Sequence, residues 1–422
     1  MNIYILGDDL VAWTLAGALA STGCHVLMQA SQLPEGNHEA TESELFLLLY
    51  QQHKAGRVTL KAALNSGLTT PLELLIDARE HQSLESIISA VKQANFPAVV
   101  ALVHTVAIGT TDALQQHLVQ QQSHTAVVYW PNFIQAGRAL SSFTRVEQVL
   151  LGGDHSDAKA LIKRLMLPFN RSHDRFYEVT AREAELAKIA INGMLATRIS
   201  YMNELSKLAE ATDIDIESIR KCMGRDSRIG FQYLYPGCGF AGNALTDSLH
   251  QLNQELEKVN EHDQGLLSGV LRINEQQKDQ LFQKFWRFYK ANIRQKCVAI
   301  WGAAYKPNTA SVAGSPALHL IQTLLEQGVM VRVYDPMAMN GLKQYFGEPD
   351  GLFYAENAFD AVEQADALML ITEWKEFWNI DLARAKSLMN NALMLDGRNV
   401  YDPTLLAAQG WTYSGVGRGQ KV

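Results

Sequence analysis

The segment from Pro236 to Ser248 reads PGCGFAGNALTDS and combines glycines, a thiol and other small residues in one stretch. A cysteine thiolate becomes an effective nucleophile when a neighbouring base or cation lowers the pKa of its thiol. Cys238 lies between two glycines, and nothing close to it in the sequence indicates such a base. Glycines in this stretch could be present for backbone geometry alone. We therefore do not expect Cys238 to act as a nucleophile.

Two other groups of residues have types suited to chemistry. Lys188 and Asn192 are four positions apart in a helical pattern, which places an amine and an amide on one helix face. Gly7, Asp8 and Asp9 follow a short apolar run, at a turn of the kind that leads into an anion-binding helix N-terminus. Each carboxylate there would repel an anion by about 1–4 kcal/mol at surface-like dielectrics. This turn is therefore poorly suited to a bare phosphate.

Composition excludes several classes of function. A chain of 422 residues is long enough for two or three domains. A net charge of −7 argues against a nucleic-acid surface. The most apolar stretch, 96–109, is too short to cross a membrane, and we expect no signal peptide and no membrane insertion. The cysteines show no paired metal spacing, so we expect no metal site and reduced thiols in the cytoplasm: Cys24, Cys222, Cys238 and Cys297.

Strand and helix patterns alternate at both ends of the chain. The apolar run 2–6, a helical segment to residue 22 and the strand-like run 25–28 form a βαβ opening. A second such unit begins near Cys297. The middle lacks strand signals and shows helical periodicity. We predict an α/β protein with two Rossmann-like doubly wound parallel-sheet domains, 1–180 and 290–422, joined by a helical middle domain, 181–289, with one long helix.

Several blocks of the chain resemble the UDP-glucose/GDP-mannose dehydrogenases. HTVAIGTTD (104–112) is similar to STVPVGTTD, and WPNFIQAG (130–137) is similar to NPEFLREG. DSRIGFQYLYPGCG (226–239) and WGAAYKPNTASVAGSPAL (301–318) resemble further family blocks. The blocks occur in family order across nearly the whole chain. The resemblance implies two successive hydride transfers to NAD, which oxidise a sugar C6 alcohol to a carboxylate through a thioester on a cysteine.

The resemblance assigns catalytic positions, of which only part is kept. Thr105, Lys188 and Asn192 match the family's water-orienting threonine, oxyanion-stabilising lysine and its asparagine partner. The nucleophilic cysteine falls on Ala244, whose methyl group cannot form a covalent adduct. The family's lysine and aspartate fall on Asp247 and Ser248, and its two glutamates fall on Asn132 and Ala136.

The cofactor and substrate positions also diverge. The family's GxGxxG loop keeps only Gly7, with Asp8, Asp9 and Ala12 at its other positions, and the ribose-binding carboxylate falls on Ala30. We therefore expect no bound cofactor. The positions around the nucleotide sugar are better kept, which implies a UDP-sugar ligand: Phe133, Arg228, Tyr233, Gly237, Gly239, Tyr305, Lys306 and Arg398.

The resulting hypothesis is a homologue of the nucleotide-sugar 6-dehydrogenases that has lost NAD-dependent oxidation. Such a pseudoenzyme would bind, regulate or scaffold in polysaccharide or nucleotide-sugar metabolism. The alternative is an active NAD-dependent UDP-glucose 6-dehydrogenase-like oxidoreductase with an unorthodox site. A third possibility is a one-step oxidation to the aldehyde, which needs no thiol. The resemblance also implies a homodimer formed through the middle helices.

Overall fold

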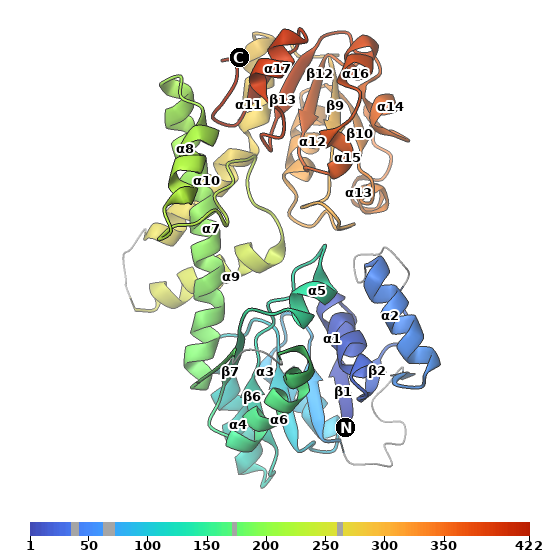
Figure 1. Cartoon of the computed structure of the whole chain (residues 1–422), viewed down its shortest axis with the longest axis vertical. Coiled ribbons are helices and arrows are strands. Elements are labelled where there is room, and N and C mark those ends of the chain that lie inside the picture. Colours follow the sequence, from blue (N-terminus) through green and yellow to red (C-terminus); the bar gives the residue numbers. More distant parts are fainter. Residues whose placement is uncertain (35–41, 62–71, 171–174, 260–264) are drawn as a thin grey trace. The chain divides into compact units, whose positions relative to one another are not determined.

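A computed structural model describes residues 1–34, 42–61, 72–170, 175–259 and 265–422. Within these ranges the chain forms two compact units, Met1–Ala190 and Ile191–Val422. The 31-residue helix α7, Ala181–Ala211, belongs to both units, because the boundary between them falls within it (Figure 1). The expected long helix is therefore present.

The first unit is built on an eight-stranded sheet with the order β3-β2-β1-β4-β5-β6-β7-β8. The strands β4 and β5 are buried along their whole length, as expected where helices cover both faces of a parallel sheet. The neighbours β6 and β7 pair antiparallel, at Tyr129 and Gly152, and all other neighbours are parallel. The strands are β1 (Asn2–Leu6), β2 (His25–Gln29), β3 (Val58–Lys61), β4 (Leu74–Asp77), β5 (Val99–Leu102), β6 (Ala126–Tyr129), β7 (Val149–Gly152) and β8 (Phe176–Val179).

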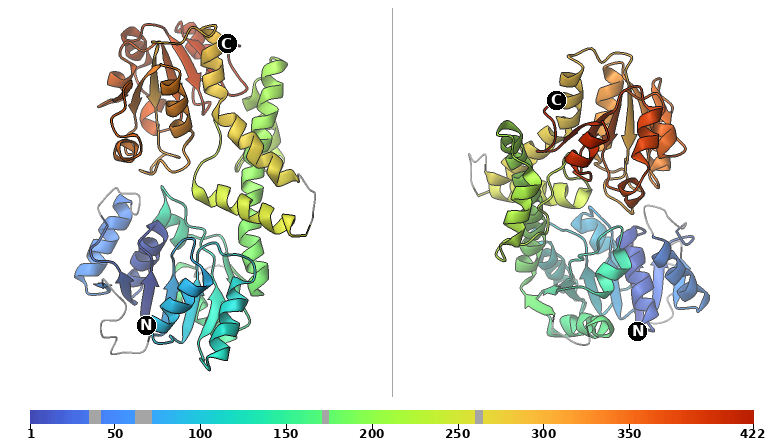
Figure 2. Two further views of the ribbon diagram at one scale, coloured as in Figure 1. Left: turned by 180° about the vertical axis from the view of Figure 1, so that it is seen from behind. Right: turned by 45° about the horizontal axis from the view of Figure 1, so that its top comes forward.

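The strand β1 shows how both faces of this sheet are buried. Ile3 and Ile5 pack in a core that includes residues of α1, α2 and α6. Tyr4 and Leu6 point to the other face and pack in a second core, which includes residues of α3 and α4. Helices lie on both sides of the sheet, as Figure 2 shows. They are α1 (Leu10–Ser21), α2 (Ser43–Lys54), α3 (Leu84–Gln93), α4 (Thr110–Gln120), α5 (Ala139–Thr144), α6 (Ser156–Met166) and the 3₁₀ helix η1 (Leu167–Phe169).

The second unit contains an all-parallel sheet of six strands in the order β11-β10-β9-β12-β13-β14. Its strands are β9 (Cys297–Trp301), β10 (Met330–Tyr334), β11 (Leu352–Tyr354), β12 (Ala367–Leu370), β13 (Leu393–Asp396) and β14 (Thr412–Gly415). Its helices are α12 (Pro316–Glu326), α13 (Met339–Phe346), α14 (Ala358–Val362), α15 (Lys375–Trp378), α16 (Leu382–Leu388) and α17 (Pro403–Ala408). Both sheets match the predicted fold class.

The middle of the chain is helical, and residues 181–259 and 265–289 contain no strand. The helix α7 starts with a capping box, in which Thr180 and Glu183 exchange hydrogen bonds between side chains and backbone N–H groups. A small core that includes Ala196, Leu249 and Val270 joins α7 to α9 and α10. The other middle helices are α8 (Ile216–Arg225), α9 (Asn243–Glu257), α10 (Leu266–Lys278) and α11 (Gln280–Phe288).

The apolar residues of α7 are only partly core residues. Ile189 is fully buried, whereas Leu186 and Met194 are 44% and 62% exposed. The three-domain division at 181 and 290 stays a prediction. Among the described residues, no helix is both long and apolar enough to cross a membrane.

Candidate functional site

The turn after β1 is held by hydrogen bonds between its own residues and the first turn of α1. Gly7 adopts a φ of +121°, and a Cβ there would meet the Ala78 carbonyl oxygen at 2.8 Å, so glycine is required. Asp9 is the N-cap of α1, and its Oδ1 accepts a hydrogen bond from the Ala12 N–H at 2.8 Å. The Asp8 carbonyl oxygen accepts a hydrogen bond from Trp13 Nε1 at 2.9 Å. A carboxylate therefore occupies the helix terminus at which dinucleotide-binding folds hold a diphosphate.

The next parallel strand, β4, ends in an internal ion pair. Asp77 is 4% exposed, and its two carboxylate oxygens accept hydrogen bonds from Arg79 Nε at 2.9 Å and Nη2 at 2.6 Å. Arg79 also donates to the Ser86 hydroxyl. The Arg79 guanidinium is thus already bound by Asp77 and Ser86. The half-buried Ala30, just after β2, offers no side-chain acceptor for a ribose hydroxyl.

Lys188 is a predicted catalytic residue whose buried surroundings shift its pKa. Its ammonium donates to the Asn132 carbonyl oxygen at 2.6 Å and lies 4.7 Å from the centre of the Phe133 ring. The side chain is 8% exposed, and this burial lowers the pKa of Lys188 to about 8. Thr105, just after β5, is half-buried in the same unit. The structure therefore joins Lys188 to the segment that carries the predicted sugar contact Phe133.

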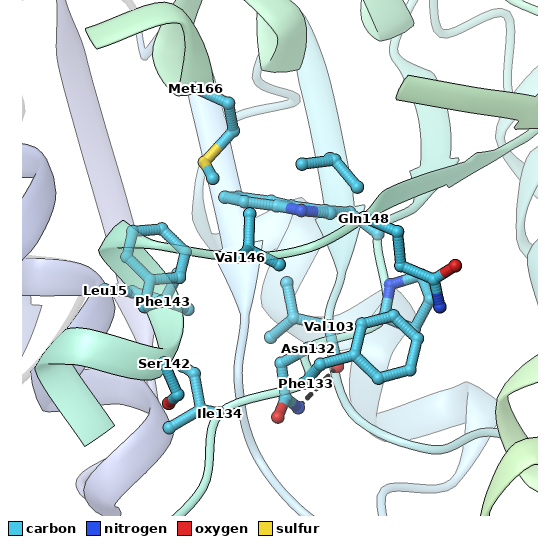
Figure 3. A pocket seen from close by; sticks show the side chains of 13 residues that line it. Leu15, Val103, Asn132, Phe133, Ile134, Ser142, Phe143, Val146, Gln148 and Met166 are labelled. Carbon is cyan, nitrogen blue, oxygen red and sulfur yellow. Dashed lines mark hydrogen bonds between the residues drawn. The ribbon is translucent and has the colours of Figure 1, made fainter. Parts of the chain in front are cut away.

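The segment after β6 is itself fixed to β5. Asn132 donates from both its backbone N–H and its side-chain Nδ2 to the Val103 carbonyl oxygen, at 2.9 and 2.8 Å. A small pocket lies beside it, lined mostly by apolar side chains such as Leu15 and Phe143 (Figure 3). The resemblance places Asn132 at a family glutamate, and in this structure its amide holds the Val103 backbone.

Glu185 is a site-supporting residue that sequence reasoning missed. Its carboxylate is fully buried and accepts hydrogen bonds from the Gly109 N–H, the Thr111 N–H and the Thr111 hydroxyl, at 2.6, 2.9 and 2.6 Å. Burial raises the pKa of Glu185, although these hydrogen bonds oppose the shift. Glu185 ties α7 to the start of α4 one turn before Lys188. The sequence shows only a glutamate within a helix, and nothing in it marks Glu185 as a buried residue.

In the second unit, Asn192 lies against the first turn of α9. Its Nδ2 donates to the Ala244 carbonyl oxygen at 3.1 Å and to Ser248 Oγ at 2.9 Å. The Ser248 hydroxyl in turn donates to the Ala244 carbonyl oxygen at 2.7 Å. Ala244 is exposed, so the position that the resemblance gives to a nucleophile carries only an accessible methyl group.

Cys238 does not replace the missing thiol. It is 1% exposed, and its Sγ lies 3.9 Å from the Ile371 carbonyl oxygen. Burial raises the pKa of the Cys238 thiol, which disfavours the thiolate. The expectation that Cys238 is not a nucleophile agrees with this environment.

Two buried asparagines hold the glycine-rich loop around Cys238. Asn203 on α7 accepts a hydrogen bond from the Gly237 N–H at 2.8 Å. Asn274 on α10 accepts from the Phe240 N–H at 2.8 Å and donates to the Phe240 carbonyl oxygen at 3.2 Å. Gly239, between them, has a φ of +105°. Neither asparagine was singled out from the sequence.

The predicted substrate residues of the second unit have different surroundings. Arg228 is 86% exposed in its side chain and pairs with Asp226 at 2.7 Å. Lys306 lies over the Tyr305 ring at 5.4 Å, and a Cβ on Gly242 would meet that ring at 3.0 Å. Tyr233 is half-buried, with a φ of +60°.

Arg398 is already engaged within the second unit. Its Nε lies 3.2 Å from a Glu373 carboxylate oxygen and also donates to the Ile371 carbonyl oxygen. A Cβ on Gly237 would come within 3.5 Å of the Arg398 guanidinium. The structure therefore brings together Tyr305 with Lys306, and Arg398 with the Gly237 loop.

The chain is similar to known dehydrogenases along its whole length. It is 31% identical to a UDP-glucose 6-dehydrogenase of Pseudomonas aeruginosa, over 99% of this chain and 98% of that protein. It is 29% identical to the UDP-glucose 6-dehydrogenase YwqF of Bacillus subtilis, over the same shares. A solved UDP-glucose dehydrogenase from the archaeon Pyrobaculum islandicum has the same fold, with a TM-score of 0.83 at 24% identity, over 99% of this chain and 97% of that one.

Three domain models of one family match the chain in order. They are described as the NAD binding domain (residues 1–170), the central domain (182–276) and the UDP binding domain (299–403) of the UDP-glucose/GDP-mannose dehydrogenase family. The match over residues 1–170 contradicts the expectation that no cofactor binds, and NAD is the expected cofactor. That expectation rested on a few loop residues, whereas the domain model matches residues 1–170. The chain belongs to the UDP-glucose/GDP-mannose dehydrogenase family.

Proposed function

We propose that this chain binds a nucleotide sugar but does not oxidise it to the acid, and that it acts by binding, regulation or scaffolding in nucleotide-sugar or polysaccharide metabolism. The observation that carries the proposal is the exposed methyl group of Ala244 in the first turn of α9. The family reaction, as the resemblance implies it, needs a thiol at this position for its second oxidation. An alkyl group has no lone pair with which to attack an aldehyde.

Ser248 and Cys238 are poorly placed to supply the missing nucleophile. The Ser248 hydroxyl is 1% exposed and exchanges hydrogen bonds with Asn192 and the Ala244 carbonyl oxygen. Cys238 is buried with a raised thiol pKa. Neither side chain is therefore suited to carry a covalent acyl intermediate.

Support for a nucleotide-sugar ligand comes from the UDP binding domain that residues 299–403 match. Lysine at 306 and arginine at 228 are the charges suited to a diphosphate, because charge-assisted hydrogen bonds favour phosphate oxygens. Arg228 is the more accessible of the two predicted arginines, since Arg398 is held by Glu373. We propose UDP-glucose as the first ligand to test, because the two curated relatives reported above are named for it.

A second candidate function is a single oxidation of the alcohol to the aldehyde. Lys188 favours it, because an amine with a pKa of about 8 is partly neutral near pH 8 and could accept the alcohol proton. When bound, NAD supplies the acceptor for the hydride. The alcohol proton would move to Lys188 Nζ. The Asn132 carbonyl oxygen and the Phe133 ring stabilise the ammonium that results.

Three finer points stay predictions. The homodimer is supported by the exposed apolar side chains of α7, such as Met194, Tyr201 and Leu208. The cytoplasmic location and the domain boundaries at 181 and 290 come from the sequence alone. We propose them as part of the same account.

The experiment compares wild type with Ala244→Cys, each incubated with UDP-glucose and NAD. Calorimetry measures UDP-glucose binding, and mass spectrometry with an aldehyde-trapping hydroxylamine identifies products. We expect binding without UDP-glucuronate for wild type. Trapped aldehyde would favour the one-step candidate, and failure to bind any UDP-sugar would contradict the binding role.

Ala244→Cys is not expected to restore acid formation on its own. The two family glutamates are still Asn132 and Ala136, and catalytic groups that act together are strongly non-additive. Acid formed only by this variant would mean that the cysteine is the sole missing group.

A further inference from the structure

Three side chains that can bind a metal ion converge at the carboxyl edge of the first sheet. Asp9 follows β1, Glu80 follows β4 and His104 follows β5, and these three strands are neighbours in the sheet. One ligand atom of each lies within 4.8 Å of the others. No local sequence motif marks the group, because its members come from three separate loops, and no metal site is expected from the sequence.

The contact between His104 and Asp9 is the central observation. Nε2 of His104 lies 3.0 Å from Asp9 Oδ2, yet it is buried without a hydrogen-bond partner among the described residues. The His104 side chain is 10% exposed. In the neutral imidazole whose proton lies on Nδ1, the Nε2 lone pair faces the Asp9 carboxylate, and the two repel each other unless an electropositive centre lies near both. Burial makes the repulsion costlier, because little water can screen it.

The hydrogen bonds of Asp9 leave one of its carboxylate oxygens available to bind a metal ion. Asp9 uses Oδ1 to cap α1, so that Oδ2 remains for a second ligand. Glu80 Oε1 lies 3.8 Å from His104 Nδ1, and its side chain is 51% exposed, which gives it freedom to rotate and leaves a path from solvent. Arg79, the neighbour of Glu80, is held by Asp77 and does not occupy the cluster with a positive charge.

We propose that Asp9, Glu80 and His104 form a binding site for a divalent cation of the zinc type. Imidazole nitrogen and carboxylate oxygen are both among the ligands that Zn²⁺ takes in proteins. Three protein ligands leave a fourth position open. The cation occupies the place where the lone pair of His104 and the charge of Asp9 otherwise face each other.

The position of this site gives the cation a second role, which rests on NAD being the cofactor of the first unit. The cluster includes the N-cap of α1, where a diphosphate binds in dinucleotide folds. Without a cation, the carboxylates of Asp9 and Glu80 repel a diphosphate. With a divalent cation bound, the two carboxylate charges are neutralised, and a phosphate oxygen can take the open coordination position. The loop GDDLVA is then compatible with the expected cofactor.

The first test measures zinc binding by calorimetry with zinc chloride in a non-chelating buffer at pH 7. All proteins carry Cys222→Ser, because Cys222 is an exposed thiol that could bind zinc by itself. Asp9→Asn is the main variant, since asparagine caps a helix about as well as aspartate and removes only the charge. His104→Gln removes the nitrogen ligand.

Matched controls are available in the same unit. Asp154→Asn and His155→Gln make the same chemical changes at exposed neighbours after β7. We expect Asp9→Asn and His104→Gln each to weaken zinc binding at least about tenfold, because even the loss of an outer-shell partner typically costs about 10–100-fold. The controls should bind like the parent protein. Equal zinc affinity in all five proteins would overturn the site, and His104 would then be part of a simple ion pair.

The second test measures ADP binding with and without zinc, with ADP as a probe for the diphosphate group. We expect zinc to strengthen ADP binding to the parent protein at least about tenfold, by the same measure of a metal contact, and not to do so in Asp9→Asn. An ADP affinity unaffected by bound zinc would overturn the bridging role. Neither test depends on UDP-sugar binding or turnover, so its outcome is separate from that of the proposed function.

Discussion

Asn192 donates a hydrogen bond to the Ala244 carbonyl oxygen, at 3.1 Å. The asparagine that the resemblance places in the catalytic set is thus a backbone clamp on the helix turn that lacks the thiol. The same amide reaches Ser248 Oγ, where the resemblance expects an aspartate. Asn192 therefore has a structural use in this chain that does not depend on catalysis.

The first prediction follows from this clamp. Asn192 is 8% exposed, and Asn192→Ala removes the two hydrogen bonds that this buried side chain donates to the first turn of α9. We expect the free energy of unfolding to fall by about 1–3 kcal/mol, the usual cost of leaving buried polar groups unpaired. Urea unfolding followed by circular dichroism measures it. The exposed Asn292→Ala is the control, and an equal, small effect of both changes would show that the clamp does not stabilise the turn.

The second prediction concerns the pH dependence of stability from Lys188. The pKa of Lys188 is about 8 in the folded protein, below the 10.5 of an exposed lysine. Between these values the unfolded chain holds more protons than the folded one, so this residue makes stability rise with pH. From pH 7.5 to 9.5 the gain should approach about 2 kcal/mol.

The measurement compares wild type with Lys188→Met, each unfolded in urea at pH 7.5 and at pH 9.5. Other groups titrate in both proteins, so the difference between their pH responses isolates Lys188. Wild type should gain stability relative to the variant at the higher pH. Parallel responses would mean that Lys188 has an ordinary pKa and would weaken the one-step oxidation candidate.

The third prediction concerns assembly. Met194, Tyr201 and Leu208 are each more than half exposed on α7. A row of large apolar side chains on one long helix is unfavourable in water and is typical of an interface. We expect light scattering at micromolar concentration to give roughly twice the chain mass of 46.9 kDa. Tyr201→Glu should shift the protein toward monomer, and a monomeric wild type would rule the dimer out.

The sequence predicted the layered fold well for a physical reason. Strands such as β4 and β5 are buried on both faces, and continuous apolar runs like theirs are visible without any tertiary information. The antiparallel pairing of β6 with β7 was missed, because apolar periodicity does not encode strand direction. Helical periodicity alone does not separate a core position from an exposed one, and on α7 Ile189 is buried whereas Leu186 and Met194 are exposed.

The candidate site was less predictable. Asn203 and Asn274 hold the glycine-rich loop, yet each is a lone amide in a helical sequence with nothing to mark its partner. The contact of His104 with Asp9 joins positions 95 residues apart, and only the order of the strands brings them together. The cofactor expectation was wrong because it rested on a few positions, Asp8, Asp9, Ala12 and Ala30, whereas the NAD binding domain model matches residues 1–170 as a whole.

The most direct test of the central claim is the stoichiometry of NADH formation from UDP-glucose by the wild-type protein. The reaction contains NAD and zinc, is followed by absorbance over hours, and is analysed for UDP-glucuronate at its end. Because Ala244 cannot carry a thioester, we predict no UDP-glucuronate and at most one NADH per sugar, which would be recovered with the aldehyde. Two NADH per sugar, together with UDP-glucuronate, would contradict the account.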